Sequence, residues 1–124
     1  MFKKFLPVLF LPLLLAGCAT SITNLTPLQQ KRNANNLYPV EVALDSSQQT
    51  LRWDSIRPQI LVGSDFYPMR ATLLMTNRWE GLVPVPPGAS SAKYRYKIDY
   101  EYNSFGKPKA GSFLSHEYLL RILP

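Results

Sequence analysis

The chain has 124 residues and a formal net charge of +6 at pH 7, with 14 Lys plus Arg against 8 Asp plus Glu. This length allows one domain with its tails, and a hydrophobic fraction of 46% excludes a chain that is disordered throughout. With one Cys and one His, the sequence excludes an internal disulfide and predicts no metal site and no cofactor, because such sites need several ligands.

Residues 1–18 have the pattern of an export signal, MFKKFLPVLFLPLLLAGC. Lys3 and Lys4 precede an apolar run from Phe5 to Leu15. A membrane-spanning helix needs roughly 20 apolar residues, so this shorter run predicts a signal peptide over residues 1–17 that is removed after export.

The apolar run ends in Leu15-Ala16-Gly17-Cys18, which resembles the lipobox of bacterial lipoprotein precursors. The resemblance implies that the Cys18 thiol receives a diacylglycerol, that the chain is cut before Cys18, and that the new N-terminus is acylated, commonly with palmitate. Membrane lipid is then one partner of the mature chain, and several acyl chains hold it firmly. Ala19 follows the cysteine where an Asp would favour the inner membrane, so the resemblance implies an outer-membrane lipoprotein facing the periplasm or the surface.

Cleavage before Cys18 removes Lys3 and Lys4 and lowers the formal charge from +6 to about +4. This mild basic balance suits anionic lipid or an acidic partner, and it is too weak to indicate nucleic-acid binding.

Residues 18–36 are predicted to be the lipidated cysteine and a flexible tether. The segment is rich in Thr, Asn and Gln, and it shows little sustained apolar periodicity. An alternative is a short helix around Leu25 and Leu28 that packs against a partner.

Residues 37–124 have the pattern of short strands separated by turns. Apolar and polar residues alternate from Tyr38 to Leu44 and without interruption from Lys93 to Tyr102, which predicts half-buried strands. Further strands are predicted over residues 50–53, 56–62, 70–75 and 79–85. Residues 103–111 are predicted to be a loop, and residues 112–123 one long final strand.

About seven short strands without a convincing helix predict an all-β domain. Their count and spacing favour a small immunoglobulin-like or fibronectin-III-like antiparallel β-sandwich. Trp53 and Trp79 are candidate core anchors of this sandwich.

No catalytic constellation is visible in the sequence, so we predict that the protein is not an enzyme. The motifs of serine hydrolases, nucleotide-binding loops and zinc proteases are absent. Carboxylates such as Glu80, Asp99 and Glu117 define no pair at a readable spacing, and His116 is interpreted as a structural residue of the last strand.

The most unusual stretch is WEGLVPVPPG, which combines a large aromatic residue, an acid and three prolines. It predicts a stiff contact surface for an envelope protein partner, formed by Trp79, Glu80, Pro84, Pro86 and Pro87. The alternative is that these prolines only blunt an edge strand.

The sequence therefore predicts a lipid-anchored, non-catalytic interaction or assembly module of the outer membrane. The alternative function is glycan or peptidoglycan binding through exposed Trp and Tyr side chains, among them the tyrosine row of residues 94, 96, 100 and 102. Burial of these aromatic rings would remove the residues on which the alternative depends.

Overall fold

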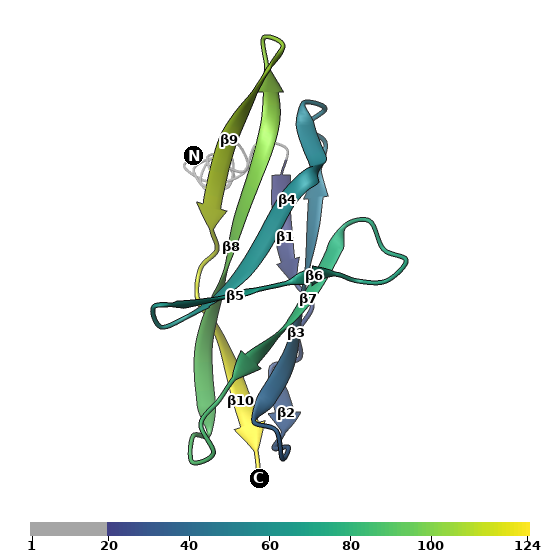
Figure 1. Ribbon diagram of the computed structural model, residues 1–124. Helices are drawn as coiled ribbons and strands as arrows, with labels where there is room; N and C mark the ends of the chain where they lie inside the picture. Colours follow the sequence, from purple (N-terminus) through teal and green to yellow (C-terminus); the bar gives the residue numbers. More distant parts are fainter. Residues whose placement is uncertain (1–19) are drawn as a thin grey trace, which may run out of the picture.

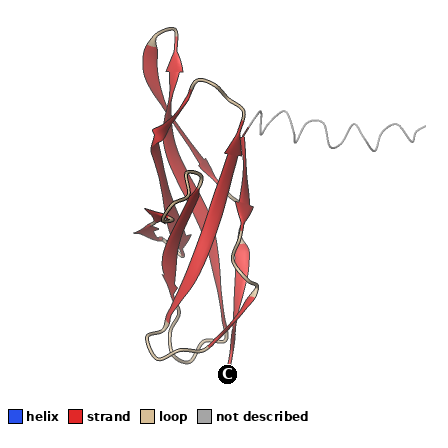
Figure 2. Cartoon of the chain, turned by 90° about the vertical axis from the view of Figure 1, so that its right-hand side faces the viewer, coloured by secondary structure: helices blue, strands red, loops and turns tan. Residues whose placement is uncertain are grey.

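Ten strands and no helix make up residues 20–124, the part of the chain that the computed structural model describes (Figure 1, Figure 2). The predicted signal peptide and Cys18 lie outside these residues. None of the described residues belongs to a helix that could cross a membrane. The strands are β1 (Thr20–Asn24), β2 (Gln29–Lys31), β3 (Leu37–Ser46), β4 (Leu51–Val62), β5 (Asp65–Pro68), β6 (Arg70–Ala71), β7 (Arg78–Pro84), β8 (Ser91–Ser104), β9 (Lys107–Leu114) and β10 (Tyr118–Leu123).

The strands form two packed sheets, which confirms the predicted β-sandwich. One sheet has the order β1-β3-β7-β6, and the other has the order β2-β10-β8-β4-β5, with β9 paired to β8 as well. Sequential strands are thus distributed between the two layers, as in immunoglobulin-type sandwiches. Neighbouring strands are antiparallel except β2, which runs parallel to β10.

Alternation along the strands explains where the core lies. On β3 the buried Tyr38, Val40 and Val42 face the second sheet, and on β8 the buried Tyr94, Tyr96 and Ile98 face the first. Successive side chains of a strand point to opposite faces, so the residues between these positions face outward. No disulfide joins the two layers, and burial of large aromatic side chains takes its place.

The prediction of a flexible tether is wrong for residues 20–31, which contribute β1 and β2. β1 pairs with β3 from Thr20↔Ser46 to Asn24↔Val42, and β2 pairs with the last strand. Asn24 explains the attachment: its Nδ2 donates to Tyr94 Oη at 2.8 Å and its Oδ1 accepts from Tyr96 Oη at 2.7 Å. Buried hydroxyl groups need such partners, and here the N-terminal segment supplies them.

Three strand predictions also need correction. The predicted buried strand over residues 70–75 ends at Ala71, and Leu73 and Leu74 are almost fully exposed in the loop before β7. The predicted loop over residues 103–111 is mostly strand, because β8 and β9 form a tight hairpin. The predicted final strand is interrupted at residues 115–117, which separate β9 from β10. Both strands pair with β8, but the register of β10 is shifted by one residue relative to that of β9.

Burial of Tyr96 makes the fold sensitive to alkali. Desolvation raises the pKa of its hydroxyl well above the ordinary value of about 10, and burial also raises the pKa of Tyr118. The folded state therefore keeps the proton when the unfolded chain loses it, so this stability is complete below about pH 10 and declines above it. We expect the free energy of unfolding to fall by up to about 1.4 kcal/mol per pH unit from Tyr96 alone.

Urea titrations between pH 9 and about pH 11.5 measure this slope. We expect the Tyr96→Phe variant to be less stable at neutral pH, because hydrogen bonds are lost, but to show a shallower alkaline slope. An identical slope in the variant would contradict the role of Tyr96.

Candidate functional site

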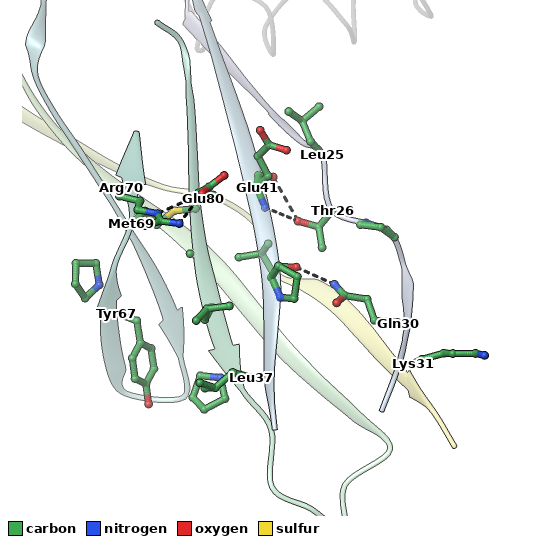
Figure 3. Close-up of a pocket in the computed structure, with 17 residues that line it drawn as sticks. Leu25, Thr26, Gln30, Lys31, Leu37, Glu41, Tyr67, Met69, Arg70 and Glu80 are labelled. Carbon is green, nitrogen blue, oxygen red and sulfur yellow. Dashed lines mark hydrogen bonds and ion pairs between the residues drawn. The ribbon is translucent and has the colours of Figure 1, made fainter. Parts of the chain in front are cut away.

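An open groove of about 1240 Å³ crosses the outer face of the sheet β1-β3-β7-β6 (Figure 3). β3 and β7 form its floor. One wall comes from the segment that leads into β2, and the other comes from residues 67–70, where the chain passes from β5 to β6. Figure 3 shows Gln30 and Tyr67 on opposite sides of the two floor strands.

The floor of the groove is mainly apolar. Pro39 of β3 lies opposite Leu82 of β7, and Leu37 lies opposite Pro84. Leu82 has an exposed fraction of 48% and Leu37 is also exposed, so apolar surface faces solvent here. Tyr67, Pro68 and Met69 on one wall, with Leu25 and Pro27 on the other, extend this apolar surface.

Two carboxylates lie at one end of the floor. Glu41 of β3 and Glu80 of β7 are directly opposite each other. Arg70 binds Glu80 through an ion pair of 3.1 Å, and the Thr72 hydroxyl lies 3.3 Å from a Glu41 carboxylate oxygen. One guanidinium thus faces two carboxylates, which gives this end of the groove a formal charge of −1 and favours a basic group on a ligand.

The outer edge of β7 is open beside the groove. β6 pairs with β7 only at Arg70↔Glu80 and Ala71↔Trp79. The preceding strand, β5, belongs to the other sheet, where Pro68 pairs with Gln59. Within residues 20–124, no strand is therefore hydrogen-bonded to the β7 edge beyond Glu80, where Pro68 and Met69 lie next to Gly81.

The backbone of Leu82 points toward this open edge. Glu41 directs its N–H to Thr26 Oγ1 at 2.9 Å and its C=O to the Leu25 N–H at 2.9 Å, both away from β7. Glu41 and its partner Glu80 are therefore a pair without mutual hydrogen bonds. Because backbone groups alternate between the two edges of a strand, Pro39 and Leu82, two positions further along, are another such pair. The N–H and C=O of Leu82 consequently point away from β3, toward the edge at which no strand is hydrogen-bonded to β7.

The residues predicted as a contact surface do not lie together. Glu80 and Pro84 line the groove, whereas Trp79 has an exposed fraction of 8% and belongs to the core. Pro86 and Pro87 lie in the exposed loop that follows β7. Alternation along β7 explains the division, because Trp79 and Val83 point inward while Glu80, Leu82 and Pro84 point outward.

The proline loop is held in place by a residue of the segment predicted to be a tether. The Arg32 guanidinium donates to the carbonyls of Pro87 and Ala89, each at 2.8 Å. The stiffness predicted for this loop therefore has a second source besides its prolines.

Three of the six aromatic residues considered for the glycan-binding alternative are buried. Trp79, Tyr94 and Tyr96 belong to the core, while Tyr100 and Tyr102 are partly exposed. Trp53, predicted as a core anchor, has an exposed fraction of 40% in the irregular part of β4, so that prediction is wrong. The register of β4 against β8 shifts between Arg52 and Arg57, which turns Trp53 outward.

His116 lies exposed in the short break between β9 and β10, with its ring 4.4 Å from the Tyr118 ring. Among residues 20–124, no three His, Cys, Asp or Glu side chains gather closely enough to hold a metal ion. Comparison of the chain with protein-family models and with curated protein sequences gives no match.

Sequence reasoning did not find the groove. The floor residues come from two strands that are distant in sequence, namely Leu37, Pro39, Leu82 and Pro84. One wall comes from the segment predicted to be a tether, and the other comes from residues 67–70, at the junction between two predicted strands. The visible signals were Pro39 within the alternating strand and the outward position of Leu82, which leave apolar groups on a face that is ordinarily polar.

Proposed function

We propose that the protein is a lipid-anchored, non-catalytic module of the bacterial outer membrane that binds a protein partner. Acylated Cys18 holds it at the membrane, and the groove across β3 and β7 is its contact surface. The observation that carries this proposal is the coincidence of an apolar floor with an open strand edge in the same groove.

The partner that fits this site is an extended segment of an envelope protein. Such a segment can add beside β7 through the N–H and C=O of Leu82, as in other cases of strand addition. Its apolar side chains would cover Leu82 and Leu37, and a basic side chain would approach Glu41. Pro84 has no N–H, so pairing ends after Leu82, which limits uncontrolled growth of the sheet.

The site chemistry favours binding over catalysis. Glu41 and Glu80 lie side by side in an open groove, with neither a nucleophile activated by a base nor a histidine beside them. Binding needs only a shaped apolar surface and a few directed polar groups. Attachment to a membrane raises the local concentration of the module, so a modest interface suffices.

A photoreactive phenylalanine analogue at position 82 tests the contact surface in the acylated protein within its native envelope. We expect one dominant protein adduct at this position and none at Leu119, which has similar exposure on the other sheet. Leu37→Asp, on the floor beside position 82, should reduce this adduct by about tenfold or more, which corresponds to about 1.4 kcal/mol of binding free energy.

Circular dichroism and thermal unfolding first establish that each variant is folded. Exposed positions ordinarily change stability by no more than about 0.5 kcal/mol. The same adducts at positions 82 and 119, or no effect of Leu37→Asp, would contradict a contact surface in the groove.

A further inference from the structure

The end of the sandwich that carries the lipid anchor can be identified from strand register. Cys18 precedes Thr20 by two residues, which span at most about 7 Å. Thr20 is fixed to the end of β3, where its Oγ1 lies 2.7 Å from Ser46 Oγ. An acyl anchor on Cys18 would therefore lie close to this end of the sandwich.

The β8–β9 hairpin projects from the same end. Leu51, at the start of β4, pairs with Tyr102, and the Asn103 N–H donates to the Thr50 carbonyl at 2.9 Å. Beyond that level the hairpin continues to its turn at Phe105 and Gly106. In Figure 1 the turn lies at the top of the molecule, above the β3–β4 turn and the start of β1.

The side chain at this turn has no role in the fold. Phe105 has an exposed fraction of 102% and a φ of +51°, and Gly106 follows with a φ of +79°. Two successive left-handed residues make a two-residue hairpin turn in which Asn-Gly is the preferred pair. A bulky aromatic residue is unfavourable there, and full exposure gives no compensating burial. Strain of this kind commonly marks a functional position.

The surroundings of Phe105 are cationic. Lys107 and Lys109 are exposed on β9, and no acidic residue occurs between Tyr102 and His116. The nearest acid along β8, Glu101, forms an ion pair with Arg52 at 3.3 Å. An aromatic tip beside lysines is a combination that suits the interface of an anionic bilayer.

We propose that the β8–β9 hairpin inserts Phe105 into the interfacial layer of the bilayer that holds the acyl chains, while Lys107 and Lys109 meet anionic headgroups. This inference rests on the proposed acylation of Cys18, because one phenylalanine binds too weakly to hold a protein at a membrane by itself. With the anchor in place, the hairpin is a second contact that fixes the orientation of the sandwich.

The orientation has a consequence for the groove. Leu37 stands nine positions along β3 from Ser46, a distance of about 30 Å for an extended strand. With the hairpin on the membrane, the apolar end of the groove is held away from the lipid and faces the partner. In Figure 1 the C-terminal end of β10 lies at the opposite end of the molecule from the hairpin.

The test uses acylated protein in vesicles of phosphatidylethanolamine and phosphatidylglycerol that contain a lipid-borne quencher. Acylation consumes the thiol of Cys18, the single cysteine of the chain, so Ser104→Cys and Leu123→Cys each carry one free thiol for an environment-sensitive fluorophore. Ser104 adjoins Phe105, and Leu123 is the control at the opposite end. We expect quenching at position 104 to exceed that at position 123 several-fold.

A second variant separates the contribution of the Phe105 side chain to membrane contact from that of the rest of the hairpin. Phe105→Asn retains the turn, because Asn readily adopts the left-handed conformation. It should lower quenching at position 104 to the level at position 123 without loss of thermal stability. Equal quenching at the two positions, or quenching at 104 that survives Phe105→Asn, would overturn the hairpin contact. Protein that does not float with vesicles and takes up two labels would show that Cys18 is unacylated, which overturns both the anchor and the hairpin contact.

Discussion

Asn24→Ala is expected to lower the free energy of unfolding by about 2–4 kcal/mol, an unusually large effect for a polar residue near the chain terminus. Asn24 binds the hydroxyl groups of both Tyr94 and Tyr96, whose side chains are fully buried. The variant leaves the Tyr94 hydroxyl without its partner and removes the shortest hydrogen bond of the Tyr96 hydroxyl, which keeps Glu41 O and Thr26 Oγ1 at 3.2 Å. It also loosens the attachment of β1. A buried polar group that loses its partner costs about 1–3 kcal/mol.

Chemical denaturation followed by the fluorescence of Trp53 and Trp79 measures this effect. The matched control is Asn35→Ala, an exposed residue of the turn before β3, which should change stability by no more than about 0.5 kcal/mol. Equal stabilities of the two variants would show that residues 20–24 are dispensable for the fold, as the tether prediction required.

The sandwich was predictable because its core strands alternate strictly. Tyr94, Tyr96 and Ile98 on β8 follow a period of two, as do Tyr38, Val40 and Val42 on β3. Such a pattern predicts both that the segment is a strand and which of its faces is buried. The first two strands were missed because β1 is mostly polar in sequence: besides Ile22, which packs against the core, it contributes backbone pairing and the Asn24 amide.

An antiparallel hairpin of the last two predicted strands was expected and is present, but the tight turn between β8 and β9 was missed for a different reason. Its turn is Phe105-Gly106, which lacks the Asn or Asp that ordinarily signals a two-residue turn, and β9 begins with the exposed sequence Lys-Pro-Lys. Phe105, which made the turn unrecognisable in the sequence, is also the residue whose full exposure the fold does not explain. Local rules commonly fail at positions where function opposes stability.

The candidate site was only half predictable. Sequence reasoning selected the neighbourhood of β7 from its prolines and acid, and Glu80 and Pro84 do line the groove. It could not separate the inward Trp79 from the outward Leu82, because the strand register and the sheet change between β5 and β6 are tertiary features.

The second large effect concerns Cys18. Under the proposed acylation, Cys18→Ser should abolish membrane attachment, because a hydroxyl cannot replace a thiol as the acceptor of the diacylglycerol. After cell fractionation and vesicle flotation, we expect the wild type in the membrane fraction and the variant depleted from it by more than tenfold. Each buried methylene of an acyl chain contributes about 0.8 kcal/mol, so loss of the chains far outweighs any contact made by Phe105 alone.

Ser47→Ala is the control for this comparison, since it changes an exposed serine in the β3–β4 turn and leaves Cys18 intact. It should fractionate as the wild type does. Membrane attachment of Cys18→Ser at the wild-type level would mean that another part of the chain holds the protein there.

The most direct measurement is mass spectrometry of the N-terminal peptide from protein purified out of its own membranes. A lipid-anchored module predicts a peptide that begins at Cys18 and carries the mass of a diacylglyceryl group with a further acyl chain. A peptide that begins at another residue, or a Cys18 with a free thiol, would contradict the anchor and the function built on it.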